Sequence, residues 1–124
     1  MSIAPSSGPP KEPVKVLLLE NIHESAHRLF VAEGVEIQTR SSALKGDELA
    51  AAIQGVHVLG IRSKTHVTAS VLDKADKLLS IGCFCIGVNQ VDLAAANRRG
   101  VPVFNAPFSN TRSVAEMIIG ELIF

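Results

Sequence analysis

Short apolar runs alternate with amphipathic stretches along most of this chain. Residues 15–19 (KVLLL) form an almost continuous apolar run, which is typical of a strand buried on both faces of a parallel sheet. The stretch that follows predicts a helix with Asn21 as its N-cap and Gly34 as its C-cap. Residues 35–39 then alternate apolar and polar side chains, as a half-exposed strand does.

The same alternation continues to residue 104. The predicted helices are 47–54, a segment capped by Thr68 that runs to about Ala75, and 93–99, which Asp92 caps. The predicted strands are 56–61, 78–81 and 101–104, and Pro102 favours an edge or terminal position for the last of them. Five strands that alternate with helices predict an α/β fold, with a parallel sheet covered by helices on both faces.

The two ends of the chain differ from this pattern. Residues 1–13 are rich in Ser and Pro, and we expect a disordered tail there. Residues 113–124 (SVAEMIIGELIF) form a strongly apolar helix pattern without the Gly, Asn, Pro or basic residues that usually end a helix. We therefore expect the chain to be a piece of a longer protein, in which this helix continues.

Composition narrows the possible functions. The chain has 124 residues, 47% hydrophobic and 19% charged, which is enough apolar material for one folded domain. Its 12 basic and 12 acidic residues balance, so no net charge favours nucleic acid or an anionic membrane. No apolar stretch approaches the roughly 20 residues of a membrane span. The N-terminus lacks the features of a secretory signal, and we expect a cytoplasmic protein.

The two cysteines, Cys83 and Cys85, are separated by one residue, which places both side chains on one face of an extended strand. Two cysteines cannot complete a structural zinc site, and no His follows them at ligand spacing. We expect reduced, partly buried thiols, with a redox pair as the alternative. His23 and His27 have metal-compatible spacing on a helix, but only Glu24 is near them, so no metal site is predicted.

Ligands of open parallel sheets bind beyond the carboxyl ends of the strands, and three loops should meet there. In the first loop, the cations Arg62 and Lys64 flank Ser63, and in an extended loop their side chains should point the same way. Such a set suits a carboxylate or a phosphate. The alternative is two solvated surface cations. His66 follows this loop and is a weaker candidate for the same site.

The second loop, 82–89, carries Gly82 and Gly87, and the alternative to ligand binding is an ordinary turn. It is not a phosphate loop, because Val88 and Asn89 stand where Lys and Ser or Thr are required. The third loop ends at Asn110, where free backbone N–H groups at the start of the last helix favour an anion or a carbonyl oxygen. The alternative for Asn110 is plain helix capping.

The segments IRSKTHVT, IGCFCIGVNQVDLAAANRRGVPVFNAP and FSNTRSVAEMIIGEL together resemble the N-terminal part of the D-2-hydroxyacid dehydrogenases, over residues 14–124. Within that family, the Cys-Phe-Cys-Ile-Gly segment is similar to that of the bacterial D-3-phosphoglycerate dehydrogenases. The resemblance implies a flavodoxin-like substrate lobe at 14–112. It also implies that 113–124 begins a helix crossing into a Rossmann domain that binds NAD.

The resemblance further implies the oxidation of 3-phospho-D-glycerate to 3-phosphohydroxypyruvate with NAD, in serine biosynthesis, by a homo-oligomeric full-length enzyme. Its catalytic Arg, Glu and His would lie outside this sequence, so the chain alone should be inactive. The residues that match the family's substrate side are Arg62, Ser63, Lys64, Ile86, Gly87 and Asn110, with Ile86 and Asn110 also near the nicotinamide. The alternative is a stand-alone flavodoxin-like binding or regulatory module.

Overall fold

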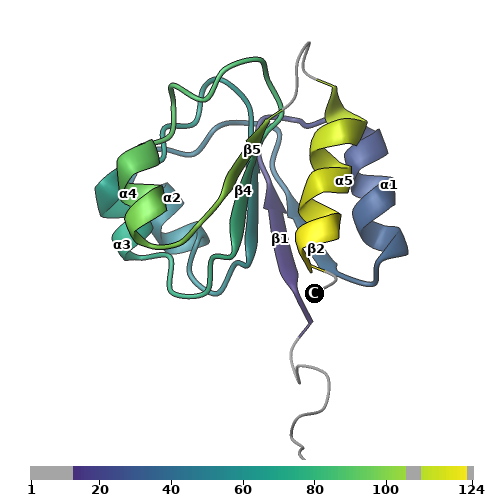
Figure 1. Ribbon diagram of the computed structural model, residues 1–124, viewed down its shortest axis with the longest axis horizontal. Helices are drawn as coiled ribbons and strands as arrows, with labels where there is room; N and C mark the ends of the chain where they lie inside the picture. Colours follow the sequence, from purple (N-terminus) through teal and green to yellow (C-terminus); the bar gives the residue numbers. More distant parts are fainter. Residues whose placement is uncertain (1–12, 106–109, 123–124) are drawn as a thin grey trace, which may run out of the picture.

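Within residues 13–105 and 110–122, which the computed structural model describes, five strands form one sheet in the order β2-β1-β3-β4-β5 (Figure 1). All neighbouring strands are parallel. The strands are β1 (Lys15–Leu18), β2 (Glu36–Thr39), β3 (Val58–Ile61), β4 (Ser80–Cys83) and β5 (Val103–Asn105). The helices are α1 (Glu24–Ala32), α2 (Gly46–Ala52), α3 (Ala69–Asp73), α4 (Leu93–Arg98) and α5 (Thr111–Leu122). The predicted α/β fold is confirmed, and its strand order is the flavodoxin-like one.

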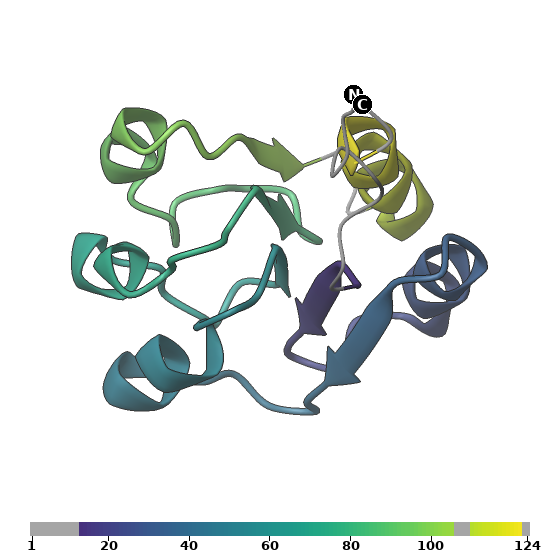
Figure 2. The same ribbon diagram turned by 90° about the horizontal axis from the view of Figure 1, so that it is seen from below.

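Helices cover both faces of the sheet, with α2, α3 and α4 on one side and α1 and α5 on the other (Figures 1 and 2). Successive strand residues point to opposite faces, so Leu17 joins one buried cluster while Val16 and Leu18 join the other. The central strands β3 and β4 are buried along their whole length. This double burial explains why their sequences do not alternate between apolar and polar residues, Ser80 being the one polar residue in the two strands.

Two strand glycines have side chains packed directly over them, on the face of the sheet that α1 and α5 cover. A Cβ on Gly60 would lie 2.5 Å from Leu18 Cδ2, and one on Gly82 would lie 2.5 Å from Ile118 Cδ1. Both distances are shorter than packed carbon atoms allow, so a larger residue at either position would force these side-chain ends to shift.

The start of α1 differs from the sequence-based prediction. Asn21 does not cap the helix; the N-cap is His23, whose Nδ1 accepts the Ser25 N–H at 3.0 Å. Glu20 and Asn21 both have left-handed backbone conformations, with φ of 64° and 54°. This turn after β1 delays the helix, because helical residues need negative φ. Gly34, with φ of 75°, follows the C-cap Glu33 and ends the helix as expected.

The last three strands begin two residues later than predicted. Their predicted first residues, Val56, Leu78 and Val101, are buried, but they precede the hydrogen-bonded ladder. An apolar residue in the sequence indicates burial and not strand pairing, so the predicted strands began too early. As a consequence, Gly82 and Cys83 belong to β4 and not to the loop after it. β5 lies at an edge of the sheet, as Pro102 indicated.

The ends of the chain test the terminal predictions only in part. Of the predicted tail 1–13, the structure describes Pro13 alone. The predicted last helix is present as Thr111–Leu122, and its final two residues lie outside the described part. Among the described helices, none combines the length and the apolar character that a membrane span requires.

Candidate functional site

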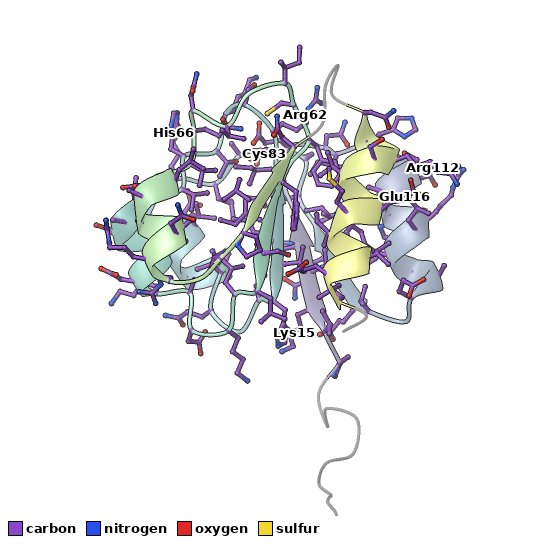
Figure 3. The ribbon with its side chains drawn as sticks, in the orientation of Figure 1. Lys15, Arg62, His66, Cys83, Arg112 and Glu116 are labelled. Atoms are coloured by element: carbon purple, nitrogen blue, oxygen red, sulfur yellow. The ribbon has the colours of Figure 1, made fainter. Side chains whose placement is uncertain are left out.

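The carboxyl ends of the parallel strands meet at the upper edge of the sheet in Figure 1, and the loops that follow them gather there. Arg62 follows β3 directly and lies at this edge (Figure 3). The loop after β4 and the start of α5 are at the same edge. The topology therefore brings the first two predicted loops and Asn110, the end of the third, to one end of the molecule, while residues 106–109 lie outside the described part.

The backbone of the Arg62 loop is hydrogen-bonded to a carboxylate. Glu20, which follows β1 and is only 8% exposed, accepts the backbone N–H groups of Arg62 at 2.7 Å, Lys64 at 2.8 Å and Thr65 at 3.0 Å. Residues 63 and 64 form bends rather than extended backbone. Three amides directed at one carboxylate group require such bending, which corrects the expectation of an extended loop with Arg62 and Lys64 pointing the same way.

The pKa of Glu20 is lowered from its ordinary value of 4.5. Burial acts in the opposite direction and would raise it, but the N–H groups donated by Lys64 and Arg62, with those of Thr65, outweigh that effect. The carboxylate is thus charged at neutral pH and accepts hydrogen bonds with both oxygens.

Two side-chain amides tie the second loop to its neighbours. Gln90, which is almost fully buried, donates from Nε2 to the Arg62 carbonyl at 2.8 Å and to Cys85 Sγ at 3.1 Å. Asn105, at the end of β5, donates from Nδ2 to the Ile86 carbonyl at 2.6 Å. These bonds fix the backbone between residues 85 and 87 relative to the strands on either side.

A hollow of about 550 Å³ opens between the first two loops. It brings together four of the predicted substrate residues, Arg62, Ser63, Ile86 and Gly87, and the weaker candidate His66. The remaining lining residues are Cys85, Asn89 and Gln90. Ile86 is 69% exposed, so it adds apolar surface beside the cationic loop.

Lys64 lies apart from this hollow. It lines a second one, of about 410 Å³, with Arg62, Ser63, Glu20 and residues 41–43. A third hollow, of about 290 Å³, connects Arg62 with Thr111 at the start of α5. Arg62 lines all three, so it is the residue that the three spaces share.

Asn110 caps α5, with Oδ1 accepting the Ser113 N–H at 3.0 Å and its backbone carbonyl accepting the Val114 N–H. Ser113 and Glu116 have the spacing of a capping box in the sequence, but Ser113 lies inside the helix and does not cap it. The cap uses only the Asn110 oxygen, and among the described residues Nδ2 has no hydrogen-bond partner. Asn110 is not among the residues that line the Arg62 hollows; its neighbour Thr111 is.

The cysteines lie on one face of the β4 segment, as predicted, and both thiols are free. Cys83 is buried in the core, and burial, with smaller effects from Cys85 and Glu20, raises its pKa to about 12. Cys85 is half-buried and donates its S–H to the Gly87 carbonyl at 3.2 Å. It therefore helps to shape the Gly87 turn.

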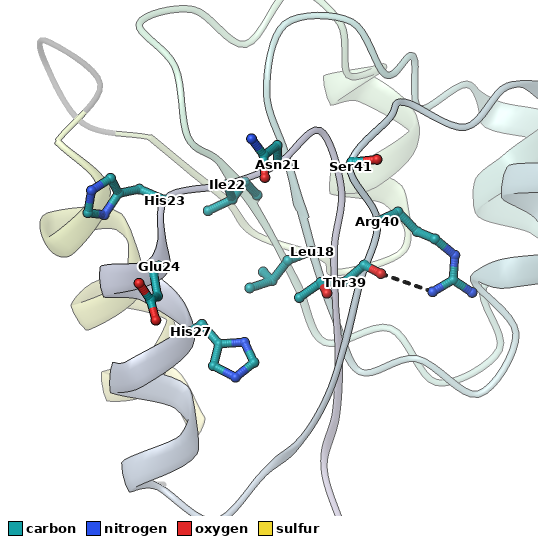
Figure 4. A pocket seen from close by; sticks show the side chains of 9 residues that line it. All are labelled: Leu18, Asn21, Ile22, His23, Glu24, His27, Thr39, Arg40 and Ser41. Carbon is teal, nitrogen blue, oxygen red and sulfur yellow. Dashed lines mark hydrogen bonds between the residues drawn. The ribbon is translucent and has the colours of Figure 1, made fainter.

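A separate hollow of about 530 Å³ lies between the start of α1 and the end of β2 (Figure 4). His23, His27 and Arg40 line it, and the Arg40 guanidinium donates to the Thr39 carbonyl at 3.1 Å. In the part of the chain that the structure describes, no three His, Cys, Asp or Glu side chains are grouped so as to hold a metal ion. His57 has a structural contact, since its Nδ1 accepts the Lys15 N–H at 3.0 Å.

Sequence reasoning did not identify Glu20, Gln90 or Asn105 as site residues. Glu20 ends an apolar run and Asn105 ends β5, so strand-end position was the one available signal for them. Gln90 gave no signal, because polar residues in a loop are ordinarily exposed.

Comparison with known proteins identifies the family. The model of the "D-isomer specific 2-hydroxyacid dehydrogenase, catalytic domain" family matches residues 16–118. The chain belongs to this family. It is 55% identical to D-3-phosphoglycerate dehydrogenase of Dictyostelium discoideum over 119 residues, 96% of this chain and 29% of that protein. It is 53% identical to D-3-phosphoglycerate dehydrogenase of Escherichia coli (strain K12) over 114 residues, 91% of this chain and 28% of that protein.

Solved structures share the fold. The TT0316 protein of Thermus thermophilus matches with a TM-score of 0.72 at 29% identity, covering 89% of this chain and 36% of that one. NAD+-bound 3-phosphoglycerate dehydrogenase of Entamoeba histolytica matches with a TM-score of 0.68 at 23% identity, covering 91% of this chain and 39% of that one. The chain thus spans less than a third of the two curated relatives and under two fifths of these structures.

Proposed function

We propose that this chain is the substrate lobe of an NAD-dependent D-3-phosphoglycerate dehydrogenase. In this proposal, residues 14–112 form the lobe and 113–124 begin the helix that crosses to the NAD-binding domain. The observation that carries it is the hollow in which Arg62 and Ser63 face Ile86 and Gly87, in a chain 55% identical to a D-3-phosphoglycerate dehydrogenase. Its cytoplasmic location and a homo-oligomeric state stay predictions.

The chemistry of the hollow supports an acidic substrate. Arg62 is exposed, and among the described residues its guanidinium makes no ion pair or hydrogen bond, so its donors are available. The same holds for the Lys64 ammonium group. A planar guanidinium can bind a carboxylate or phosphate through two parallel hydrogen bonds, while an ammonium group acts as a point charge.

The proposed division of roles follows from position. Arg62 and the Ser63 amide bind an acidic group of 3-phospho-D-glycerate, and Lys64 adds positive charge from the adjoining hollow. Backbone groups at Ile86 and Gly87 orient the substrate, because hydrogen bonds from Gln90 to Cys85 Sγ and from Asn105 to the Ile86 carbonyl hold that turn in place. The Arg, Glu and His that resemblance assigns to catalysis are outside this sequence.

A cofactor fits only at the margin of this lobe. Ile86 offers an exposed apolar side chain, and Asn110 offers a free amide donor at the start of α5; both suit the edge of a nicotinamide ring. NAD, when bound, supplies the acceptor for the substrate's hydride. The residues of this chain would orient the hydroxy acid and exclude water from that transfer.

The test is the kinetics of the full polypeptide that contains this chain. We expect oxidation of 3-phospho-D-glycerate with NAD by the full protein, and no NADH formation by residues 1–124 alone. Arg62→Ala should raise the KM for the phosphorylated acid about tenfold or more, the factor for losing one charge-assisted hydrogen bond. Arg98→Ala, which removes an exposed arginine from α4, is the matched control and should leave the KM unchanged.

An unchanged KM for Arg62→Ala would remove Arg62 from the proposed role. Turnover by residues 1–124 alone would contradict the assignment as an isolated substrate lobe. A full protein without dehydrogenase activity would favour the alternative, a flavodoxin-like binding or regulatory module, since the strand order fits that class as well.

A further inference from the structure

We propose that Glu20 is a positioning residue for the acidic substrate: its buried carboxylate organises the Arg62 loop so that the Ser63 amide alone faces the ligand. The inference depends on the proposed function for the identity of the ligand. The positioning of the loop by Glu20 is argued from the hydrogen bonds of the described residues alone.

The first step is the distribution of amides in the loop. Of the four consecutive N–H groups from Arg62 to Thr65, Glu20 accepts three, at 2.7, 2.8 and 3.0 Å. The remaining one, Ser63 N–H, has no hydrogen-bond partner among the described residues. Ser63 lines both hollows that adjoin the loop. The carboxylate thus selects which amide of the loop is free to donate.

The second step is the anchoring of Glu20 itself. The backbone N–H of Glu20 donates to the Ser42 carbonyl at 3.2 Å, and that of Asn21 donates to the Arg40 carbonyl at 3.1 Å. Both residues adopt left-handed φ, which costs free energy in residues other than glycine. A strained, doubly tethered turn at the end of β1 fixes where the carboxylate points, and through it the loop after β3.

A carboxylate next to an anion-binding loop has two opposing effects on the binding of an acidic ligand. Its negative charge weakens the attraction of Arg62 and Lys64 for an acidic ligand, whereas its hydrogen bonds fix the loop that presents them. The charge is spread over three N–H donors, which reduces the field that reaches the ligand. We therefore expect positioning to dominate. For Glu20→Gln, loss of positioning would raise the KM for the acid substrate, whereas loss of the negative charge would lower it.

The test compares three variants in the full polypeptide. Glu20→Gln keeps the shape but places an NH2 group against N–H donors; Glu20→Asp keeps the charge but shortens the reach. If Glu20 positions the loop, both raise the KM for the acid substrate about tenfold, with kcat and the KM for NAD little changed. Asp76→Asn is the matched control. Asp76 Oδ1 accepts the Gly55 N–H at 2.9 Å. Both residues precede the strands β3 and β4 and so lie at the opposite edge of the sheet from the Arg62 loop. The Asp76→Asn variant should therefore keep the wild-type KM for the acid substrate.

Hydrogen exchange gives a readout that does not require activity. Glu20→Gln should accelerate exchange of the Arg62, Lys64 and Thr65 amides while the ladder amides of β3 keep their protection. Unchanged exchange in the loop would overturn the inference. A lowered KM for Glu20→Gln, or a wild-type KM for Glu20→Asp, would show that charge rather than position matters and would overturn it too.

The proposed function can fail separately. If the wild-type protein does not oxidise 3-phospho-D-glycerate, inorganic phosphate serves as the probe, with the Ser63 amide resonance followed by NMR. A shift of that resonance in the wild type, with about tenfold weaker binding in Glu20→Gln and Glu20→Asp, would support the positioning role in the absence of that activity. A wild type without such a shift, or equal affinity in all three proteins, would overturn it.

Discussion

Gln90 and Arg62 are 28 positions apart in the sequence, yet the Gln90 Nε2 donates to the Arg62 carbonyl at 2.8 Å. The same amide group donates to Cys85 Sγ at 3.1 Å, so one buried side chain joins the loops after β3 and β4. The relative position of these two loops is thus fixed by an interior hydrogen bond as well as by strand pairing.

Replacing Gln90 by Leu should destabilise the protein by about 1–3 kcal/mol, because the Arg62 carbonyl and the Cys85 thiol lose their buried partner. Urea unfolding followed by circular dichroism measures this change. The control is Gln38→Leu, the same substitution on the exposed edge strand β2, which should shift the free energy of unfolding by less than about 0.5 kcal/mol. Equal effects of the two substitutions would contradict the role given to Gln90.

Gly82→Ala should be destabilising, because the new methyl group would lie 2.5 Å from Ile118 Cδ1 and 3.2 Å from Val114 Cγ1. Forcing α5 away from β4 should cost about 1–3 kcal/mol. Gly120→Ala is the matched control: its Cβ would meet no atom within 4 Å, and Ala should stabilise the helix by up to about 1 kcal/mol. The Tm of Gly82→Ala should therefore fall below that of wild type, and the Tm of Gly120→Ala should rise above it. A Gly82→Ala variant as stable as wild type would show that the side chains packed over Gly82 shift without cost.

Glu20 should make stability depend on pH in the acid range. Because the pKa of Glu20 is lowered from 4.5, the folded state binds its proton less readily than the unfolded state. Its contribution is fully present above about pH 4.5 and is lost as the pH falls through the lowered folded value. Comparing urea unfolding of wild type and Glu20→Gln from pH 7 to pH 3 should show the stability difference shrinking towards low pH. A difference that is constant over this range would contradict the lowered pKa.

The two cysteines should react differently with iodoacetamide. Burial in the core raises the pKa of Cys83 to about 12, so almost no thiolate forms at pH 8 and the reagent has no access. Cys85 is half-buried at the rim of the largest Arg62 hollow and should be labelled. Mass spectrometry of the labelled peptides distinguishes the two sites, and labelling in urea, where both should react, is the control. Labelling of Cys83 at a rate similar to that of Cys85 would refute its burial.

Much of the fold could be predicted, because strand burial and helix punctuation are local properties. The apolar runs located all five strands within two residues, and Thr68 and Asp92 cap their helices as expected, accepting the Val71 and Ala95 N–H groups. Asn21 was the exception. Its sequence fits an N-cap, but the chain turns through left-handed backbone there before the helix begins. The capping preference of Asn21 did not decide where the helix begins, because the backbone turn at the end of β1 moves the N-cap to His23.

The site was predictable where it depends on strand ends and not where it depends on contacts. Loop positions after β3 and β4 sufficed to group Arg62 and Ser63 with Gly87, and the common hollow contains all three. The separate position of Lys64 could not be foreseen, because it follows from the bend that Glu20 imposes from 44 residues away.

The amino-acid sequence by itself determined the alternation of strands and helices, the parallel sheet and the edge at which its loops meet, since periodicity and capping act over a few residues. Tertiary structure alone decided which polar groups satisfy one another at that edge. Glu20, Gln90 and Asn105 each acquire a partner across 19 to 45 residues of sequence. Such pairings arise only when folding removes these groups from water and each buried donor or acceptor must find a partner among whatever the packed strands bring near.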